Sequence, residues 1–298
     1  KGRGNIAPVT INLPRIGIEA KGDIDKFFEI LKSRLVLAKE SLLHRYGILK
    51  KLRVKDLPFV AGQKLMKGAE NLEEEDSIEP ILRQGTWGIG FIGLAEALTA
   101  LIGKHHGEND EARELGVRIV TFMRQYTDKF SEETNLNWSC YATPAEGLSG
   151  KFIKKDQKMF GIIKGVTDKE YYTNSYHIPV KFPISIKKKI DIEAPYHKLC
   201  NAGHISYIEV DDSPTGEQIM DIINYIGINF HIRYCKNCGS SINSNEKKCP
   251  KCNSIDIQGI SRVTGYLSLD ERFGPGKFEE RADRCSHTGS NMNNYGVI

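Results

Sequence analysis

Four cysteines near the C-terminal end of this 298-residue chain form two Cys-x-x-Cys pairs. Cys235 and Cys238 make the first pair, Cys249 and Cys252 the second, and ten residues lie between the pairs. Each pair brings two thiolates together on a short turn, and Zn²⁺ prefers a closed tetrahedral shell of four such ligands. The spacing therefore predicts a structural zinc site, because a closed shell leaves no position for water. Iron in an all-sulfur site is the alternative, since geometry alone does not separate the two metals.

The other cysteines, Cys140, Cys200 and Cys285, are scattered along the chain without pairing logic. An odd total that includes two Cys-x-x-Cys pairs favours a reducing compartment with one metal site over a disulfide framework. We therefore expect a cytoplasmic protein. A zinc module by itself would suggest a protein that binds nucleic acid or another protein. Against that class, residues 239–248 between the pairs include no aromatic side chain to stack on a base.

Gly265 stands in the strand-like sequence S-R-V-T-G-Y-L, residues 261–267, shortly after the four cysteines. Considered alone, a glycine in such a run indicates a bulge, a tight bend or a close backbone approach. Together, the four cysteines and this glycine resemble the C-terminal module of the anaerobic (class III) ribonucleoside-triphosphate reductases. The resemblance continues through residues 272–277, Glu280 and His287, and it includes the segment I-N-L-P-R at residues 11–15.

The resemblance implies an α/β fold, a ten-stranded barrel of two five-stranded halves, of which this chain holds part. Residues 1–230 would belong to the barrel, 231–256 to the zinc-binding module, and 257–298 to a glycyl-radical loop and C-terminal tail. Alternating strands and helices along the chain favour the same α/β class. In the family, the glycine of the loop stores a free radical. Gly265 suits that role because a radical at Cα needs a planar carbon, which glycine alone reaches without pressing a Cβ on its neighbours.

The activity that the resemblance implies is the anaerobic reduction of ribonucleoside triphosphates to 2′-deoxyribonucleoside triphosphates, the precursors for DNA replication. The Gly265 radical takes a hydrogen atom from a cysteine, and the resulting thiyl radical abstracts the 3′-hydrogen of the substrate. We expect that cysteine upstream of Lys1, because none of the three scattered cysteines matches its motif. The implied partners are a second copy of the chain and an activating iron–sulfur enzyme that uses S-adenosylmethionine. Another glycyl-radical enzyme, such as a pyruvate formate-lyase relative, is the alternative, which the four cysteines and residues 11–15 argue against.

Asn12 matches the family asparagine that hydrogen-bonds the ribose hydroxyls, and an amide both donates and accepts, as a vicinal diol requires. The alternative is a structural role for Asn12, tying down the end of a strand before Pro14. The resemblance also places substrate at Thr143, Ala145 and Glu146, where we expect a strand to lead into a helix. The N–H groups at a helix N-terminus suit a triphosphate, whereas Glu146 would instead satisfy the helix cap or the ribose.

Hydrophobic periodicity predicts the elements that must position these residues. The longest predicted helix runs through Phe27, Leu35 and Leu42, with Asp23 as its N-cap. The other expected elements are a buried strand that ends at Pro14, helices over residues 88–102 and 111–130, a strand over 138–143, a helix that begins at Pro144, short strands between 160 and 210 with the clearest over 204–210, a helix over 213–227 and a strand over 228–234.

Composition narrows the possible partners. The 42 basic and 38 acidic residues leave a net charge of +4, too small and too dispersed for a nucleic-acid-binding surface. Nowhere does an apolar stretch approach the roughly 18–20 residues of a membrane helix. We therefore expect neither a nucleic-acid nor a membrane partner. His105 and His106 are predicted to be a surface pair at a helix end, and the sequence has no Walker-type or G-x-G-x-x-G phosphate loop.

Overall fold

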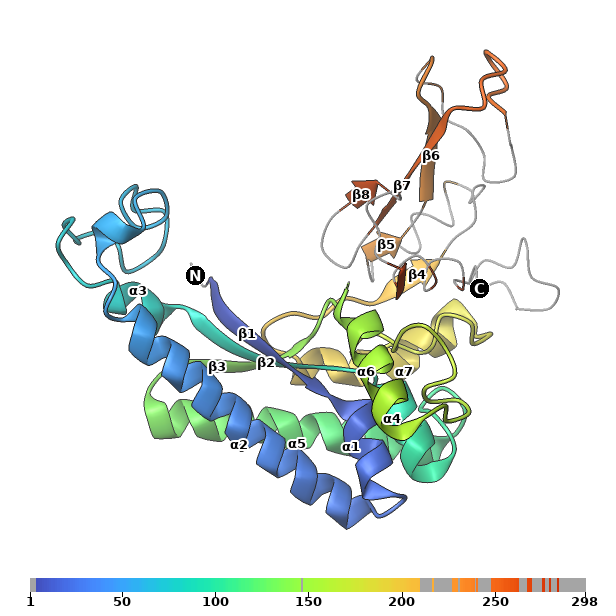
Figure 1. The fold of residues 1–298 in the computed structure, drawn as a ribbon, viewed down its shortest axis with the longest axis horizontal. Coiled ribbons are helices and arrows are strands. Elements are labelled where there is room, and N and C mark those ends of the chain that lie inside the picture. The colour runs from blue at the N-terminus through green and yellow to red at the C-terminus, as the bar shows by residue number, and fades with distance from the viewer. Residues whose placement is uncertain are drawn as a thin grey trace.

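Three parallel strands form the sheet around which the first 200 residues are organised (Figure 1). They are β1 (Asn5–Asn12), β2 (Thr86–Ile92) and β3 (Asn137–Ala142), in that order across the sheet. All seven residues of the central strand β2 are buried, as expected for a parallel strand covered on both faces. The structure is a computed structural model that describes residues 4–145, 147–209, 216, 227–229, 231–238, 240, 248–262, 267–269, 275–276, 279 and 283.

Two long helices, α2 (Ile24–Leu49) and α5 (Asp110–Thr134), run along one face of this sheet and contact β1 and β3 (Figure 1). Ile11 of β1 and Phe91 of β2 point to this face and belong to the main core together with helix residues such as Phe27. Thr10 and Asn12 point to the opposite face, because side chains alternate along a strand. The remaining helices are α1 (Leu13–Ala20), the 3₁₀ turn η1 (Val54–Asp56), α3 (Glu79–Gln84), α4 (Leu94–Ile102), α6 (Leu148–Phe160) and α7 (Ile186–Leu199).

The two longest predicted helices are confirmed. In α2, the Asp23 carboxylate caps the first turn by accepting from the Lys26 N–H at 3.0 Å, and Phe27, Leu35 and Leu42 are fully buried. Helix α5 extends the predicted 111–130 segment by a few residues at its C-terminal end. The strand predicted over 138–143 is confirmed as β3, and the one over 204–210 survives as the short β4 (Tyr207–Glu209).

Two expected boundaries near the sheet are wrong. Residues 88–92 were predicted as the start of a helix but complete strand β2, and α4 begins only after Gly93, whose φ of 74° breaks the strand. A short continuous apolar run fits a buried strand as well as a helix, so periodicity could not separate them. Pro14 does not end a strand either. It lies in the first turn of α1, where its missing N–H costs nothing.

Two further helix assignments need correction. Pro144 does not open a helix, because α6 begins at Leu148. Between 160 and 210, where we expected short strands, helix α7 buries Ile186, Ile192 and Tyr196 on one face with Pro195 inside it. The proline and the polar buried residues of that helix hid its periodicity. The helix predicted over 213–227 lies almost entirely outside the described residues.

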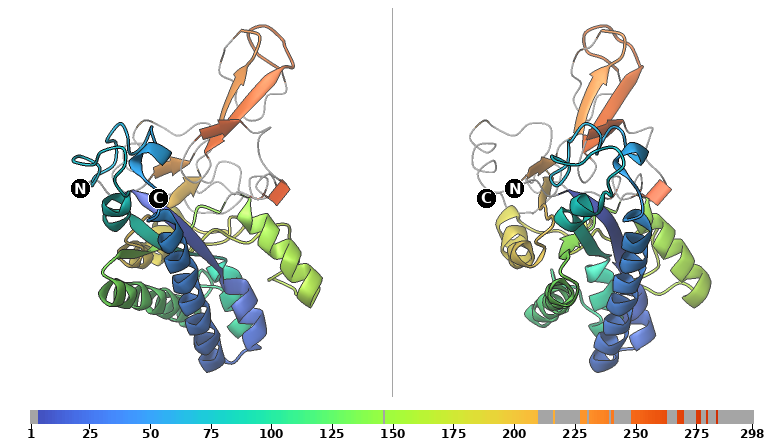
Figure 2. Two further views of the ribbon diagram at one scale, coloured as in Figure 1. Left: turned by 60° about the vertical axis from the view of Figure 1, so that its left-hand side comes forward. Right: turned by 90° about the vertical axis from the view of Figure 1, so that its left-hand side faces the viewer.

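An antiparallel sheet is formed by β6 (His231–Cys235), β7 (Ile257–Arg262) and β8 (Leu267–Leu269). Cys235 ends β6, and the other three cysteines lie in turns between β6 and β7. The strand expected over 228–234 is thus divided, with β5 (Gly227–Asn229) pairing β4 instead. In Figures 1 and 2, β6 and β7 project away from α2 and α5. None of the helices in the described ranges combines the length and the apolar character needed to cross a membrane.

His106 is buried, so the expectation of a surface histidine pair is wrong for this residue. One ring nitrogen, Nε2, donates to the Tyr176 carbonyl at 2.7 Å, and Nδ1 has no partner within the described part of the chain. Burial lowers the pKa of His106 to about 4, and the neighbouring His105 adds to that effect. His106 is therefore neutral in the folded protein at neutral pH.

This burial predicts a loss of stability on mild acidification. The unfolded chain takes up a proton near pH 6.5, whereas the folded chain does so only near pH 4, so the stability is complete above pH 6.5 and falls as the pH drops between these values. Between pH 7 and pH 5 this group should lower the free energy of unfolding by about 2 kcal/mol. Urea unfolding at both pH values should show a smaller difference in His106→Gln than in the unmodified protein. The matched variant of the exposed His44, His44→Gln, should keep the full difference, and an unchanged difference in His106→Gln would contradict the assignment.

Candidate functional site

The two cysteine pairs converge on one point. All four Sγ atoms lie within 4.8 Å of one another, and the Sγ atoms are 3.5 Å apart both for Cys235 and Cys252 and for Cys238 and Cys249. Four sulfurs bound tetrahedrally at about 2.3 Å from a zinc ion would be spaced by about 3.8 Å. The sulfur positions therefore fit a single tetrahedral metal ion without rearrangement of the backbone.

Matching backbone hydrogen bonds shape the two turns that carry these cysteines. The Cys235 N–H donates to the Ser240 carbonyl at 2.9 Å, and the Cys249 N–H donates to the Ser254 carbonyl at 2.8 Å. In addition, the Asn237 amide donates to the Cys252 sulfur at 3.8 Å, a hydrogen bond that orients this side chain. The repeated turn explains why the Cys-x-x-Cys spacing alone was enough to predict the cluster.

Strands β7 and β8 connect the cysteine cluster to the segment that contains Gly265. Cys235 pairs with Ile257 at the beginning of β7, and at its other end Arg262 pairs with Leu267, the first residue of β8. Gly265 itself lies outside the described residues, within the short connection between these two paired strand ends. The cysteine cluster thus adjoins one end of β7, and β7 pairs with β8 at the other end.

Asn12 lies at the end of β1, where the chain turns into α1 and the side chain serves two neighbours. Its Oδ1 accepts from the Arg15 N–H at 3.2 Å, which makes Asn12 the N-cap of α1. Its Nδ2 donates to Asp156 Oδ2 of α6 at 2.8 Å. The capping contact is the structural role that the sequence left open, and the amide still has one N–H and one lone pair to offer.

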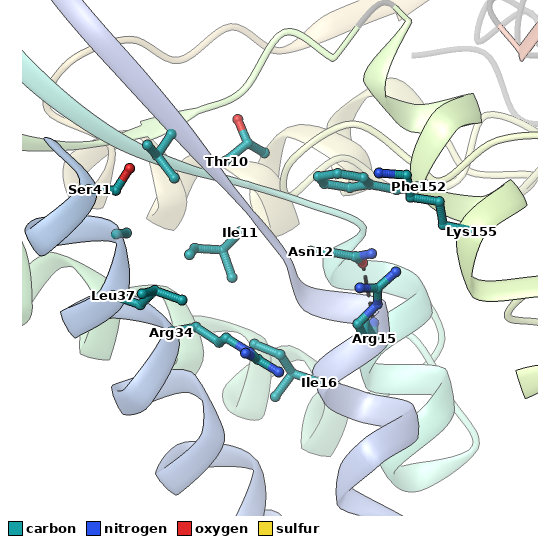
Figure 3. Close-up of a pocket in the computed structure, with 12 residues that line it drawn as sticks. Thr10, Ile11, Asn12, Arg15, Ile16, Arg34, Leu37, Ser41, Phe152 and Lys155 are labelled. Carbon is teal, nitrogen blue, oxygen red and sulfur yellow. Dashed lines mark hydrogen bonds between the residues drawn. The ribbon is translucent and has the colours of Figure 1, made fainter. Parts of the chain in front are cut away.

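A pocket of about 390 Å³ opens beside Asn12, between β1, α2 and α6 (Figure 3). Three of its lining residues are cationic: Lys155 from α6, Arg15, which pairs with Asp156, and Arg34 from α2, which lies 3.6 Å from the Glu19 carboxylate. Apolar side chains such as Leu37 complete the wall on the α2 side. The pocket therefore combines the amide of Asn12 with the Lys155 ammonium and two ion-paired guanidinium groups, which suits a polar ligand that carries hydroxyls and negative charge.

Asp156 accepts the hydrogen bonds that hold Asn12 and Arg15 together. No pattern in the sequence predicted a role for this residue. This fully buried carboxylate accepts from Asn12, from Arg15 Nε at 2.7 Å and from Arg15 Nη2, and from the Tyr172 hydroxyl at 2.9 Å. Burial raises the pKa of Tyr172, and the charge of Asp156 raises it further, so the phenol keeps its proton and donates. The available signal was its position three residues after the buried Ile153, on the apolar face of α6.

The other predicted substrate residues follow β3. Thr143 is buried, and its hydroxyl lies 3.2 Å from that of Thr10, on the same side of the sheet as Asn12. The Ala145 N–H donates to Asn174 Oδ1 at 3.2 Å, so it is not an exposed group at a helix N-terminus as expected. Glu146 lies outside the described residues. The structure therefore brings Thr143 and Asn12 to one face of the sheet.

The segment that supplies Asn174 is held against the beginning of α4. Glu96, fully buried in that helix, accepts from the Thr173 hydroxyl at 2.6 Å and from Lys169 Nζ at 2.5 Å. Burial alone would raise the pKa of Glu96, but the Lys169 ammonium and the Thr173 hydrogen bonds outweigh it, and the pKa lies below its ordinary value. No pattern in the sequence predicted a role for this segment. Its role in the structure is to fix the backbone next to Ala145.

The chain beyond Gly265 returns to the same region. Gly276 packs so closely on Gly150 of α6 that a Cβ on Gly276 would lie 3.0 Å from the Gly150 Cα atom. Asp283 accepts from the Tyr171 hydroxyl at 2.7 Å and pairs with Lys181 at 2.7 Å. Helix α6, which carries Asp156, thus also receives the segment that follows Gly265.

Comparison with known proteins agrees with this arrangement. A family model described as anaerobic ribonucleoside-triphosphate reductase matches residues 1–287. The anaerobic ribonucleoside-triphosphate reductase of Escherichia coli K12 is 38% identical over 97% of this chain and 43% of its own length. That of Enterobacteria phage T4 is 33% identical over 96% of this chain and 49% of its own length. This chain therefore spans less than half of these relatives.

Solved structures show the same fold. An anaerobic ribonucleotide reductase superimposes with a TM-score of 0.76 at 21% identity, over 95% of this chain and 45% of that one. The Thermotoga maritima enzyme in complex with dATP and CTP gives a TM-score of 0.71 at 21% identity, with the same coverage of both chains. On the strength of the family model and the relatives above 30% identity, this chain belongs to the anaerobic ribonucleoside-triphosphate reductase family.

Proposed function

We propose that the protein is an oxidoreductase that reduces ribonucleoside triphosphates to 2′-deoxyribonucleoside triphosphates under anaerobic conditions, for DNA precursor synthesis. The observation that carries this proposal is the family match over residues 1–287, which includes Asn12, the four cysteines and Gly265. The pocket beside Asn12 supports it, because it offers an amide to the ribose diol and the Lys155 ammonium to the negative charge of the substrate. A pyruvate formate-lyase-like activity or a purely binding role for the zinc module has no comparable support.

In this proposal Gly265 stores the radical, which a separate activating enzyme generates with an iron–sulfur cluster and S-adenosylmethionine. The Gly265 radical takes a hydrogen atom from a cysteine thiol outside residues 1–298, and the thiyl radical then abstracts the 3′-hydrogen of the substrate. A two-electron donor of the formate or thioredoxin class supplies the reducing equivalents. The protein acts as a homodimer in the cytoplasm.

The architecture that we propose is the ten-stranded α/β barrel of the family. Residues 1–230 form part of that barrel, 231–256 form the metal module, and 257–298 form the radical loop and the C-terminal tail. The three parallel strands β1, β2 and β3 with their covering helices support the barrel assignment. The paired strands on either side of residues 263–266 support the loop.

We assign Zn²⁺ to Cys235, Cys238, Cys249 and Cys252. Four converging sulfur atoms form a closed shell, which suits a structural ion and leaves no position for a reacting group. Bound there, zinc would link the two turns and hold the β6–β7 strands in register. The site would contribute folding free energy to the module and no chemistry to the substrate.

We propose that Asn12 hydrogen-bonds the ribose hydroxyls of the substrate. Three further residues would line the substrate region next to it: Thr143, Ala145 and Glu146. Thr143 is suited to contact substrate through its hydroxyl, which lies on the Asn12 side of the sheet. Ala145 contributes its position and not its N–H, which already donates to Asn174.

The direct test is anaerobic activation of the complete protein with a cognate activating enzyme, followed by incubation with CTP and reductant. Chromatography should show dCTP formed in amounts that exceed the radical content of the protein. A protein that carries the radical and converts no ribonucleoside triphosphate would contradict the proposed activity. The radical signal thus separates failed activation from a wrong assignment of the reaction.

Replacement of Asn12 should separate substrate binding from helix capping. Asn12→Ala removes both contacts of the side chain, and we expect kcat/KM for CTP to fall roughly ten- to hundredfold through lost hydrogen bonds, with the Gly265 radical signal unchanged. Asn12→Ser is the matched control because serine still caps a helix but has no amide to reach the ribose. We expect it to recover thermal stability and to remain as inactive as Asn12→Ala. Wild-type turnover in Asn12→Ser would show that only the cap of α1 matters.

A further inference from the structure

Three residues donate the described side-chain hydrogen bonds of Asp156, and none of them is a sequence neighbour of Asp156. Asn12 ends β1, Arg15 begins α1, and Tyr172 belongs to the segment after α6. The carboxylate is fully buried, and the guanidinium of Arg15 balances its charge with two of the four donated hydrogen bonds. Such a buried charge depends above all on its ion pair with Arg15.

The partners of Asn12 allow its amide only one orientation. A carboxylate accepts and cannot donate, so the side of the amide that faces Asp156 must be Nδ2. The backbone N–H of Arg15 donates and cannot accept, so the other side must be Oδ1. A reversed amide would place oxygen against the carboxylate and N–H against N–H. The second N–H and the second lone pair of Asn12 are consequently held in fixed places at the pocket.

We infer that Asp156 is a positioning residue that locks the Asn12 amide in the orientation needed to recognise the hydroxyls of the substrate ribose. This inference rests on the proposed function of Asn12 and adds to it a residue that does not touch the substrate. Asp156 acts through Asn12 alone, while the ion pair and two hydrogen bonds of Arg15 keep the buried carboxylate in place.

Comparison with the other buried carboxylates separates this role from ordinary core stabilisation. Glu193 is equally buried, but it bonds Lys189 on its own helix and the Ile178 N–H at 3.1 Å. Glu96 bonds Thr173 and Lys169. None of these partners lines the pocket, whereas both Asn12 and Arg15 do. Among these three acids, only Asp156 is connected directly to a pocket residue.

The test compares how well the complete protein distinguishes CTP from 2′,3′-dideoxy-CTP, which lacks both ribose hydroxyls. Each nucleotide displaces labelled CTP at equilibrium, with dATP present at saturation to fill any effector site. In Asp156→Asn the new amide both donates and accepts, so it accommodates either orientation of Asn12. We expect the preference for CTP, the ratio of the two dissociation constants, to fall roughly three- to tenfold, the effect of about one hydrogen bond.

Tyr172→Phe is the matched control, because it removes one donor from the same carboxylate and leaves the Asn12 contact intact. Its preference for CTP should equal that of the unmodified protein. If Asp156→Asn folds poorly because Arg15 loses its counter-charge, the double variant with Arg15→Gln restores the charge balance and is compared with Arg15→Gln alone. Adding Asp156→Asn to Asn12→Ala should cause no further fall in preference, since both act through the same contact.

The possible failures are distinguishable. If Asn12→Ala lowers the preference for CTP and Asp156→Asn does not, Asp156 has no positioning role and the inference is wrong. If Asp156→Asn weakens both nucleotides equally, the carboxylate is only structural. If Asn12→Ala itself leaves the preference unchanged, the proposed contact between Asn12 and the ribose fails, and the inference about Asp156 fails with it.

Discussion

Gly265→Ala should abolish the radical of the activated protein. After anaerobic treatment with the activating enzyme, S-adenosylmethionine and reductant, we expect the unmodified protein to give a carbon-radical resonance split into a doublet by the remaining α-hydrogen. The splitting should collapse when the glycine is deuterated at Cα. Alanine cannot give the same radical, because its Cβ opposes a planar Cα and blocks access to the hydrogen that must be removed.

Exposure of the activated protein to air should cleave the backbone at the same site. Oxygen that adds to a glycyl Cα radical cleaves the backbone there, so the unmodified protein should lose the residues that follow position 265. Gly203→Ala is the matched control, because a Cβ added to Gly203 would meet no heavy atom within 4 Å. It should keep both the resonance and the cut. A radical and an oxygen-dependent cut that persist in Gly265→Ala would place the radical on another residue.

Local patterns were sufficient where the partners lie close together in the sequence. The periodic stripe of Phe27, Leu35 and Leu42 predicted α2, and the carboxylate of Asp23 supplied its cap three residues before the N–H that it binds. The cysteine cluster could be predicted for the same reason. Each Cys-x-x-Cys turn is closed by its own backbone hydrogen bonds, so the spacing carries nearly all the geometry.

The sequence could not predict the structure where a residue's environment depends on a partner far away in the chain. The role of Asp156 depends on Asn12, 144 residues away, and on Arg15, and no local pattern joins them. His106 looked like a surface residue because the segment around it is polar, but Tyr176 and Tyr196 cover it. Likewise, β2 could be separated from a helix only by its pairing with β1 and β3 on both sides. Tertiary packing, not local propensity, fixed these elements.

Cys249→Ser should remove the metal and loosen the module while the parallel-sheet part stays folded. Elemental analysis of the unmodified protein should find one zinc per chain, and the variant should lose it, because serine replaces one of four converging thiolates. Structural zinc sites contribute on the order of 10 kcal/mol to folding in small modules. Limited proteolysis should therefore open residues 235–290 first. We also expect a lower radical yield, since β7 and β8, which lead into and out of residues 263–266, depend on the cluster for their anchorage.

A cysteine-to-serine substitution away from the cluster separates the effect of metal loss from the loss of stability that any buried hydroxyl causes. Cys140 is as buried as Cys249 but lies in β3, away from the cluster. Cys140→Ser should lower the melting temperature of the parallel-sheet part and leave the zinc content and the proteolysis of residues 235–290 unchanged. If elemental analysis found one iron per chain in the unmodified protein, the four cysteines would hold iron in an all-sulfur site and not zinc. Full metal content in Cys249→Ser, with an unaltered proteolysis pattern, would mean that the cysteines do not hold an ion, and the stability of the β7–β8 pair would then need another source.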